Sequence, residues 1–563
     1  MNYLEKAQQW KNFKGLDAKL KNELDHMSDD ELKEAFTNDL EFGTGGLRGI
    51  LGAGTNRMNI YIVEKATLGF GRYLLKQSKV AQSRGVAISH DNRHFSVEFA
   101  RKSAEVLTSL GFRVFLFDSL RPTPELSYAV RNFNCIGGIM ITASHNPKEY
   151  NGYKIYDETG CQLVPAMAEQ VIDEINKIDD MFNIETGLNH ELIYYIGKDV
   201  DEKYINDVKK IILRPNLKKD FKVVYTPLHG TGQVFAPDVL KSVGYNVLPL
   251  PCQMTNDPDF SGVKTSNPEN KEAYDEAIAL AKAWDADIVL ATDPDADRLG
   301  IAVRHNGEFV LFTGNQTATL EVDYILRTRK EFNTLPKDGY IFTTNVSSTL
   351  PEIIAKKYGL KVEITLTGFK FIGEKAREME QTGRGTYVFG FEESYGSLVS
   401  PMVRDKDSIQ AILILCELAA YWREKGLDLV EALDKIYQEY GYFKEDITNV
   451  ALAGLAGKAK IEKIMNYFRN NEIKLKGFNI LAKDDVKLSV HTDNKGNKTE
   501  IKLPKSNVIK YYLNDDMWFV LRPSGTEPKL KIYYGVNGKS QEESDNKLQD
   551  LKKQVLDIFN SIE

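Results

Sequence analysis

The sequence predicts an α/β protein in which three similar α/β domains, with mixed, mostly parallel sheets, are followed by a smaller C-terminal α+β domain. The chain has 563 residues, which at ~150 residues per domain corresponds to three or four domains. Hydrophobic residues make up 42% and aromatic residues 10%, enough to bury sizeable cores, which argues against a disordered or coiled-coil chain. Short apolar runs alternate with helical patterns, as in βαβ units with parallel sheets.

The charge balance narrows the classes of partner. The chain has 73 Lys and Arg against 80 Asp and Glu, a formal net charge of −7. An acidic chain of this kind argues against a protein built mainly to hold nucleic acid. A small anionic substrate remains compatible with it, because a local basic pocket is enough to bind one.

The cysteines and the apolar runs indicate a reducing, aqueous compartment. The four cysteines are too sparse for a disulfide framework, and the N-terminus has no apolar leader segment. The most apolar run, 411–422, is short and contains Glu417, so we expect a buried helix and no membrane span. We therefore expect a cytoplasmic protein. The cysteines are Cys135, Cys161, Cys252 and Cys416.

The first domain is expected to begin with helical structure and then to alternate. Residues 16–36 are charged and helical in pattern, and Ser28 and Glu31 have the spacing of a capping box. The pattern then predicts a helix at 64–78, a strand at 85–90, a helix at 96–110, and strands at 112–118 and 137–144.

The strand-then-loop pattern starts again twice before the chain changes character. Apolar strands are predicted at 222–230 and 286–293, and again at 339–347 and 386–394. The last ~120 residues instead end in two strand-like runs that flank a turn at 522–528, which indicates an α+β domain. The predicted domains are 1–215, 216–320, 321–445 and 446–563.

In open α/β sheets ligands bind beyond the carboxyl ends of the strands, so the loops there are the first candidates for chemistry. The strongest is Asp-Pro-Asp-Ala-Asp-Arg at 293–298. If this segment is extended, Asp293, Asp295 and Asp297 point to one face. Three adjacent carboxylates repel unless a cation neutralises them, and oxygen ligands favour Mg²⁺ or Ca²⁺ over Zn²⁺. We therefore predict a metal site.

Two other uses of this acidic loop fit its residues less well. An EF-hand loop needs Gly at its sixth and Glu at its twelfth position, where this chain has Arg298 and Arg304. A phosphatase of the haloacid-dehalogenase type, with Asp293 as nucleophile and Asp295 as acid/base, expects Thr or Val at the position of Asp297.

The second candidate loop, 142–147, follows the strand at 137–141. Its small residues would leave the Ser144 hydroxyl exposed at the strand end, although such a Ser is often only a turn former. Ser144 and His145 are neighbours, so their side chains diverge and a Ser–His hydrolase dyad is not favoured. A turn at 151–154 could bring Lys154 back toward Ser144; the alternative is an ordinary surface lysine.

Three further loops carry groups suited to sugar phosphates. Arg522 can bind phosphate bidentately, and Ser524, Gly525 and Thr526 can complete a nest for its oxygens, although Pro-Ser-Gly-Thr is also a common turn. Glu392, Glu393 and Ser394 can hydrogen-bond vicinal sugar hydroxyls, and the nearby segment 404–407 can add positive charge. The glycine-rich loop 42–49 has neither P-loop nor Rossmann spacing; its glycines would let the backbone and Arg48 approach a phosphate.

Taken together, these motifs resemble those of the α-D-phosphohexomutase family. TASHNP (142–147), DPDADR (293–298), FEES (391–394) and RPSGTEP (522–528) occur in the family's order, and the resemblance spans nearly the whole chain. The early FGTGGLRG and GFK at 368–370 are most similar to the branch of bacterial α-phosphoglucomutases and eukaryotic phosphoglucomutase-2-like enzymes.

The resemblance implies four domains around a central cleft, each supplying one loop. Ser144 is then the phosphoryl carrier, and the three aspartates with a phosphoseryl oxygen hold one Mg²⁺ per chain. Glu392 and Ser394 read sugar hydroxyls, and the 522–526 residues grip the phosphate that is not transferred. Lys154 is the expected general acid/base. The residues expected near the reacting groups are Arg48, His145, Lys154, Arg298 and Lys406.

The implied activity is that of a phosphoglucomutase, which interconverts glucose 1-phosphate and glucose 6-phosphate through a phosphoserine enzyme and glucose 1,6-bisphosphate. The expected partners are small sugar phosphates, with no nucleic acid and no membrane, and the chain is a monomer or homodimer. In the family that the chain resembles, the sequence E-E-S at 392–394 favours glucose phosphates as substrates. The alternatives are a phosphopentomutase or phosphomannomutase of the same family, a simple phosphatase, and a non-catalytic sugar-phosphate-binding scaffold.

Overall fold

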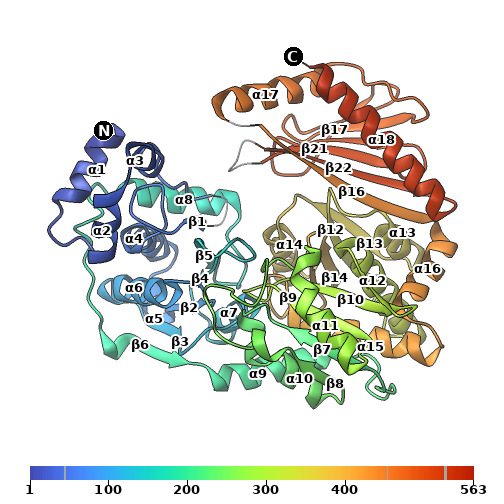
Figure 1. Ribbon diagram of the computed structural model, residues 1–563, viewed down its shortest axis with the longest axis horizontal. Coiled ribbons are helices and arrows are strands. Elements are labelled where there is room, and N and C mark those ends of the chain that lie inside the picture. Colours follow the sequence, from blue (N-terminus) through green and yellow to red (C-terminus); the bar gives the residue numbers. More distant parts are fainter. Residues whose placement is uncertain (44–45, 453, 525–528, 563) are drawn as a thin grey trace. The chain divides into compact units, whose positions relative to one another are not determined.

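The computed structural model describes residues 1–43, 46–452, 454–524 and 529–562, and the described chain divides into two compact units (Figure 1). The first unit comprises residues 1–313, 369–387 and 394–425, and the second comprises 314–368, 388–393 and 426–563.

The first unit begins with three helices that pack around Trp10, whose indole meets Phe36 and Tyr61 edge-on. Within the predicted stretch 16–36 the chain forms two helices, and the capping box of Ser28 and Glu31 starts the second of them, as predicted. These helices are α1 (Tyr3–Asn12), α2 (Ala18–His26) and α3 (Asp29–Phe36).

The first sheet of this unit has the order β1-β5-β4-β2-β3-β6. Strands β4, β2, β3 and β6 are parallel, whereas β5 runs antiparallel to both β4 and β1. The helices cover its apolar faces, and the predicted helices and strands of this region are confirmed. The strands are β1 (Gly46–Ile50), β2 (Val86–His90), β3 (Val114–Phe117), β4 (Gly137–Ile141), β5 (Tyr150–Asp157) and β6 (Ile193–Ile196); the helices are α4 (Ile60–Gln77), α5 (Ala81–Arg84), α6 (Ser96–Ser109), α7 (Thr123–Asn132) and α8 (Pro165–Asn176).

The second sheet has the order β11-β10-β9-β7-β8, with β9, β7 and β8 parallel and β10 and β11 antiparallel. The predicted apolar helix is α15, whose buried Glu417 accepts the backbone N–H groups of Leu213 and Arg214. The strands are β7 (Lys222–Thr226), β8 (Asn246–Pro249), β9 (Ile288–Thr292), β10 (Leu299–His305) and β11 (Glu308–Leu311); the helices are α9 (Lys198–Val208), α10 (Ala236–Ser242), α11 (Asp275–Trp284), α14 (Phe369–Thr382) and α15 (Ser408–Glu424).

The third sheet has the order β13-β12-β14-β15, with β12 and β13 parallel. Its helix α12 is buried along most of its length. The strands are β12 (Gly339–Thr344), β13 (Lys361–Thr365), β14 (Thr386–Glu392) and β15 (Gly396–Leu398); the helices are α12 (Gly314–Glu331), α13 (Leu350–Lys357) and α16 (Leu429–Tyr440).

The fourth sheet is antiparallel, in the order β16-β22-β21-β20-β17-β18-β19, and its core includes apolar residues of α17 and α18. The two predicted runs that flank 522–528 are the paired strands β21 and β22, so the predicted fold class is confirmed. The strands are β16 (Tyr442–Ala451), β17 (Ile480–Asp485), β18 (Val490–Asp493), β19 (Lys498–Glu500), β20 (Ile509–Leu513), β21 (Trp518–Pro523) and β22 (Lys529–Gly538); the helices are α17 (Gly454–Asn470) and α18 (Gln541–Ser561).

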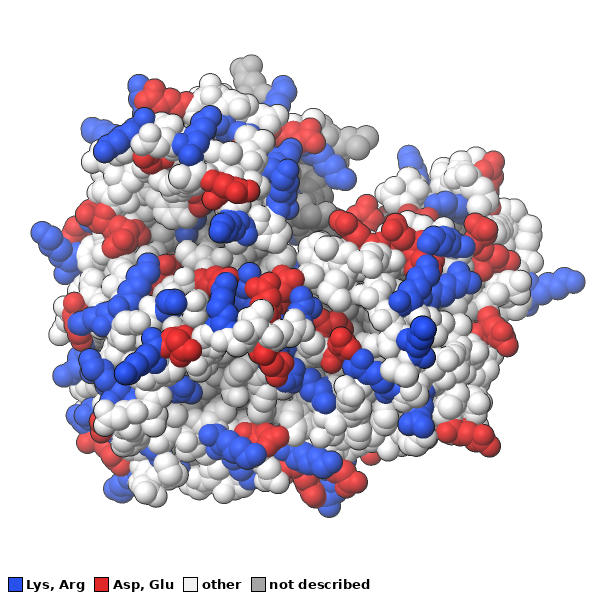
Figure 2. All heavy atoms as spheres, turned by 180° about the vertical axis from the view of Figure 1, so that it is seen from behind, with Lys and Arg blue, Asp and Glu red and all other residues white. Residues whose placement is uncertain are grey.

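The surface mixes both signs of charge. Figure 2 shows one face on which Lys and Arg are interspersed with Asp and Glu. Among the described residues, no helix has both the length and the apolarity to cross a lipid bilayer.

Candidate active site

The loop that contains Ser144, residues 142–147, leaves the carboxyl end of β4 and is called the serine loop below. Ser144 adopts a left-handed backbone conformation, with φ +54°, which costs a residue with a Cβ about 1–2 kcal/mol. Its N–H donates to Thr142 Oγ1 at 2.8 Å, and its hydroxyl donates to Asp293 Oδ2 at 2.9 Å. Ser144 is buried, at 3% exposure, so the prediction of an exposed hydroxyl is wrong: the acidic loop at 293–298 supplies its acceptor.

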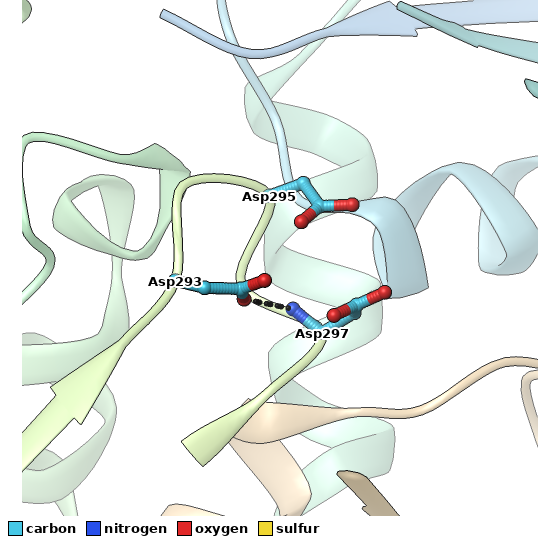
Figure 3. A group of neighbouring side chains, drawn as sticks. All are labelled: Asp293, Asp295 and Asp297. Atoms are coloured by element: carbon cyan, nitrogen blue, oxygen red, sulfur yellow. Dashed lines mark hydrogen bonds between the residues drawn. The ribbon is translucent and has the colours of Figure 1, made fainter. Parts of the chain in front are cut away.

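The acidic loop joins β9 to β10 in the same unit. Ligand atoms of Asp293, Asp295 and Asp297 lie within 4.8 Å of one another, and all three residues are buried (Figure 3). The segment is a turn, with Ala296 at φ +51°, so the prediction of an extended segment is wrong. The turn is closed by Asp293 Oδ1, which accepts the N–H of Asp297 at 3.1 Å and of Arg298 at 3.0 Å. The carboxylates converge because the backbone curls around Asp293.

Two lysines meet the acidic triad. Lys154 Nζ lies 2.8 Å from Asp295 Oδ2 and 3.7 Å from Asp297 Oδ2, and Lys406 Nζ lies 3.2 Å from Asp297 Oδ2. The prediction that Lys154 lies on a turn is wrong. Lys154 lies in β5, where it pairs with Met140 of β4. It reaches the triad because β5 runs antiparallel beside the strand that carries the serine loop. It is buried, so the reading as a surface lysine is excluded.

The charges of the triad are unevenly compensated. Burial raises the pKa of Asp293, and the carboxylates of Asp297 and Asp295 raise it further. Burial also raises the pKa of Asp295, but the Lys154 ammonium and the Thr123 hydroxyl outweigh it and hold that pKa below its usual range. For Lys154, burial lowers the pKa, yet the attraction of Asp295 and Asp297 raises it overall, so Lys154 is a cation here.

The triad fits a hard divalent cation. Asp295 Oδ1 and Asp297 Oδ1 are buried oxygens without a hydrogen-bond partner in the described chain. A buried carboxylate oxygen without a partner is costly, and an oxygen-rich donor set suits Mg²⁺ or Ca²⁺. The three aspartates are therefore the residues that could hold a metal ion.

The other predicted cations of this unit lie around the same loops. Arg298 Nη1 pairs with Glu269 at 2.6 Å, and its Nε lies 3.8 Å from Asp297 Oδ1. Arg48, on β1, donates to the side chain of Asn146 at 3.0 Å. His145 Nδ1 is 3.5 Å from Ser144 Oγ, at the long limit of a hydrogen bond; its pKa is lowered by burial and by nearby arginines, Arg298 foremost.

The predicted sugar and phosphate residues of the second unit are held by local contacts. Glu392 Oε1 accepts the N–H of Gly368 at 2.6 Å, whereas Glu393 Oε2 accepts the hydroxyls of Thr344 and Ser347 at 3.0 and 3.1 Å. Arg522 donates to the Tyr533 hydroxyl at 3.3 Å, and the Ser524 N–H donates to the Lys529 carbonyl. Ser394 begins a segment of the first unit, and Gly525 and Thr526 lie outside the described residues.

Three residues of this site were not predicted from the sequence. Thr123, at the start of α7, donates its N–H to the Asp295 carbonyl at 2.9 Å and its hydroxyl to Asp295 Oδ2 at 2.8 Å. Arg93 and Asp91 follow β2: Arg93 donates to the Ser144 carbonyl, and Asp91 forms an ion pair with Arg93. The carboxyl end of β2 was the available signal, because ligands gather beyond such strand ends.

Four family models match the chain in sequence order. Their descriptions are phosphoglucomutase/phosphomannomutase alpha/beta/alpha domain I at residues 39–181, domain II at 202–307, domain III at 313–440, and the C-terminal domain at 448–556. The four sheets and the serine, acidic and lysine groups agree with this assignment. The chain belongs to the phosphoglucomutase/phosphomannomutase family.

Similar proteins come from several organisms. A phosphoglucomutase of Staphylococcus aureus (strain MRSA252) is 39% identical over 525 residues, which is 92% of this chain and 93% of that protein. Parafusin of Paramecium, in an open form, has a TM-score of 0.69 at 20% identity and covers 92% of this chain and 95% of that one. A phosphoglucomutase/phosphomannomutase family protein of Burkholderia thailandensis has a TM-score of 0.67 at 18% identity, over 93% and 98% of the two chains. The two structures share the fold.

Proposed function

We propose that the chain is a phosphoglucomutase that interconverts glucose 1-phosphate and glucose 6-phosphate through phosphorylated Ser144 and glucose 1,6-bisphosphate. The observation that carries the proposal is the hydrogen bond from Ser144 Oγ to Asp293, inside a buried acidic triad that Lys154 also contacts. A module that only bound sugar phosphates would have no use for a hydroxyl held in this way. The 39% identity to a phosphoglucomutase over most of both chains supports the same activity.

The first requirement of such a reaction is to offset negative charge. Phosphoserine carries about −1.5 to −2 charges at neutral pH and repels a second phosphate. Lys154 and Lys406 bring positive charge to the triad beside Ser144, and Arg298 lies next to Asp297. Asp293, Asp295, Asp297 and a phosphoseryl oxygen would hold one Mg²⁺ per chain, which supplies further charge neutralisation when bound.

The phosphoryl group then moves between two oxygens. The bond from phosphorus to Ser144 Oγ breaks as a free hydroxyl of the sugar monophosphate forms the new one, giving the bisphosphate. The proton of that hydroxyl must end on Ser144 Oγ. We assign this exchange to Lys154, which is protonated beside Asp295: it gives a proton to the leaving Ser144 Oγ and, once neutral, takes the proton that the attacking hydroxyl loses. His145 is held neutral by burial and nearby cations.

The bisphosphate must turn over so that its other phosphate meets Ser144. We assign Glu392 and Ser394 to sugar hydroxyls that look alike from either end of glucose. Both carboxylates also make local hydrogen bonds, Glu392 with the N–H of Gly368 and Glu393 with Thr344 and Ser347, so the assignment of Glu392 rests on its place in the FEES motif. The phosphate that is not transferred is assigned to Arg522, Ser524, Gly525 and Thr526. Arg48 and Lys406 are assigned to substrate binding near the reacting groups, where they contact Asn146 and Asp297.

Glucose is our choice of sugar because the loop reads E-E-S, and a phosphopentomutase or phosphomannomutase is the alternative. A comparison of kcat/KM for glucose, mannose and ribose 1-phosphates decides between them. The same proposal includes four domains, each of which supplies one loop to the active site: 1–215, 216–320, 321–445 and 446–563. It also includes a cytoplasmic location and a monomeric or homodimeric state.

The carrier role is tested by Ser144→Ala, with exposed Ser83→Ala as the matched control. Conversion of glucose 1-phosphate should be lost in Ser144→Ala and retained in Ser83→Ala. Mass spectrometry after incubation with the bisphosphate should find the phosphoryl group on Ser144. Ligand-dependent stabilisation without turnover would instead indicate a scaffold, and steady release of phosphate a phosphatase. Full activity of Ser144→Ala would contradict the proposal.

A further inference from the structure

Arg93 is a buried arginine whose guanidinium is used almost entirely on the backbone of the serine loop. Its Nη2 donates to the Ser144 carbonyl at 2.6 Å, and its Nη1 donates to the Pro147 carbonyl at 2.8 Å. The residue is 3% exposed. One side chain therefore closes the loop that leaves β4 and returns as β5. The carbonyl acceptors are those of Ser144, Asn146, Pro147 and Tyr150.

The guanidinium is itself held from two sides. Asp91 Oδ2 lies 3.2 Å from Arg93 Nε, and both side chains are buried. The Phe260 ring lies 5.2 Å from the guanidinium carbon, a distance at which cation–π attraction contributes. Asp91 Oδ1 also accepts the backbone N–H of Arg93 and the hydroxyl of Ser96. The planar fork therefore has little freedom to turn, which suits recognition of several acceptors at fixed angles.

The loop needs such a clamp because Ser144 has an unfavourable backbone conformation. At φ +54° a residue with a Cβ is strained, and strain of this kind persists only where surrounding contacts determine it. Arg93 bonds the carbonyl of Ser144 itself, while the hydroxyl of the same residue donates to Asp293. The direction of Oγ thus depends on a contact made on the other side of the residue.

We propose that Arg93 is a positioning residue that holds the Ser144 hydroxyl in line with the acidic triad through the Ser144 carbonyl. The proposal rests on the proposed function, in which Ser144 carries the phosphoryl group. A misplacement of about 1 Å in a reacting group can cost roughly 100-fold in rate. Loss of Arg93 should therefore reduce phosphoryl transfer far more than it reduces binding of the sugar phosphate.

Arg84 provides a matched control within the same unit. Its Nε donates to the Asn134 carbonyl and its Nη2 to the Cys135 carbonyl, both at 3.0 Å, and its Nη1 pairs with Glu158. It therefore also ties loop carbonyls with a paired guanidinium, but at the opposite end of β2 from the serine loop. Arg84→Ala removes a comparable set of bonds without touching Ser144.

The experiment compares Arg93→Ala, Arg93→Lys and Arg84→Ala in the full chain. It measures kcat and KM for glucose 1-phosphate, phosphorylation of Ser144 by the bisphosphate, and hydrogen exchange over residues 142–150. We expect Arg93→Ala to lose about 100-fold in kcat with little change in KM, and Arg93→Lys to lose less. Added guanidinium ion should raise the kcat of Arg93→Ala and leave Arg84→Ala unchanged.

Several outcomes overturn the inference. It fails if Arg93→Ala keeps the kcat of Arg84→Ala, if only KM changes, or if guanidinium ion restores nothing. If the wild-type chain itself fails to convert glucose phosphates, the proposed function is wrong, and the exchange measurement still decides the positioning role. Faster exchange at 142–150 in Arg93→Ala, but not in Arg84→Ala, supports it and equal exchange refutes it. If Arg93→Ala does not fold, the same measurements are compared between Arg93→Lys and Arg84→Ala.

Discussion

Replacing Asp293 by Asn tests the electrostatic account of the triad, because the change removes one charge and keeps the shape. The ion pairs that described residues make with the triad within 4.0 Å all end on Asp295 or Asp297. Asp293 faces two like charges instead, and burial together with these charges raises its pKa. An Asn can still accept the N–H groups of the turn and donate to Ser144 Oγ. We predict that Asp293→Asn stabilises the metal-free protein.

The distances set the size of the effect. Two ionised carboxylates 4.8 Å apart or closer repel by about 3.5 kcal/mol or more at an effective dielectric constant of 20. Asp293 avoids part of this cost by retaining a proton. The native chain then binds more protons than the unfolded chain between the ordinary and the raised pKa of Asp293, so its stability falls as pH rises through that window. We expect Asp293→Asn to gain about 1–3 kcal/mol at pH 8 and less at pH 5.

The assay is the thermal midpoint in EDTA and in Mg²⁺ at both pH values, with exposed Asp25→Asn as the control. Ligand at 100 times its Kd adds about 2.7 kcal/mol, so Mg²⁺ should raise the midpoint of the wild type and of Asp25→Asn, but raise that of Asp293→Asn little. A destabilised Asp293→Asn in EDTA, or a difference that does not change with pH, would refute the reasoning.

Three further predictions concern other groups of the molecule. Lys154→Met should lower kcat by about 10²- to 10⁴-fold, while Mg²⁺ should still raise the thermal unfolding midpoint of this variant. An unchanged kcat would show that Lys154 does not transfer the proton. Thr123→Val deletes the hydrogen bond from the Thr123 hydroxyl to Asp295 and should weaken Mg²⁺ affinity by about 10-fold or more. Titration calorimetry measures this affinity, and an unchanged value would contradict the prediction. Lys510, buried and bonded to the Asn345 carbonyl, has its pKa lowered by burial to about 8. Because the unfolded chain keeps that proton to higher pH, stability should rise by up to about 3 kcal/mol between pH 8 and 10.5, and Lys510→Met should abolish this rise in urea unfolding.

The sequence alone was sufficient for features that depend on neighbours along the chain. Apolar strands, amphipathic helices and the capping box at Ser28 follow from side-chain periodicity and local hydrogen bonds, and they are confirmed. The ordered motifs were sufficient for the family, and the fold class followed. The acidic loop was also recognisable, because three aspartates at alternate positions are unfavourable without a cation.

The tertiary structure decided how these groups meet. The triad converges on a turn instead of an extended segment, and Lys154 reaches it from a strand. Ser144 is buried and strained, and Arg93 holds it from a loop 51 residues away. None of this is visible in local sequence, because a positive φ at a residue other than glycine is imposed by distant contacts. Local propensity sets which elements form, whereas burial and long-range hydrogen bonds set where their functional atoms point.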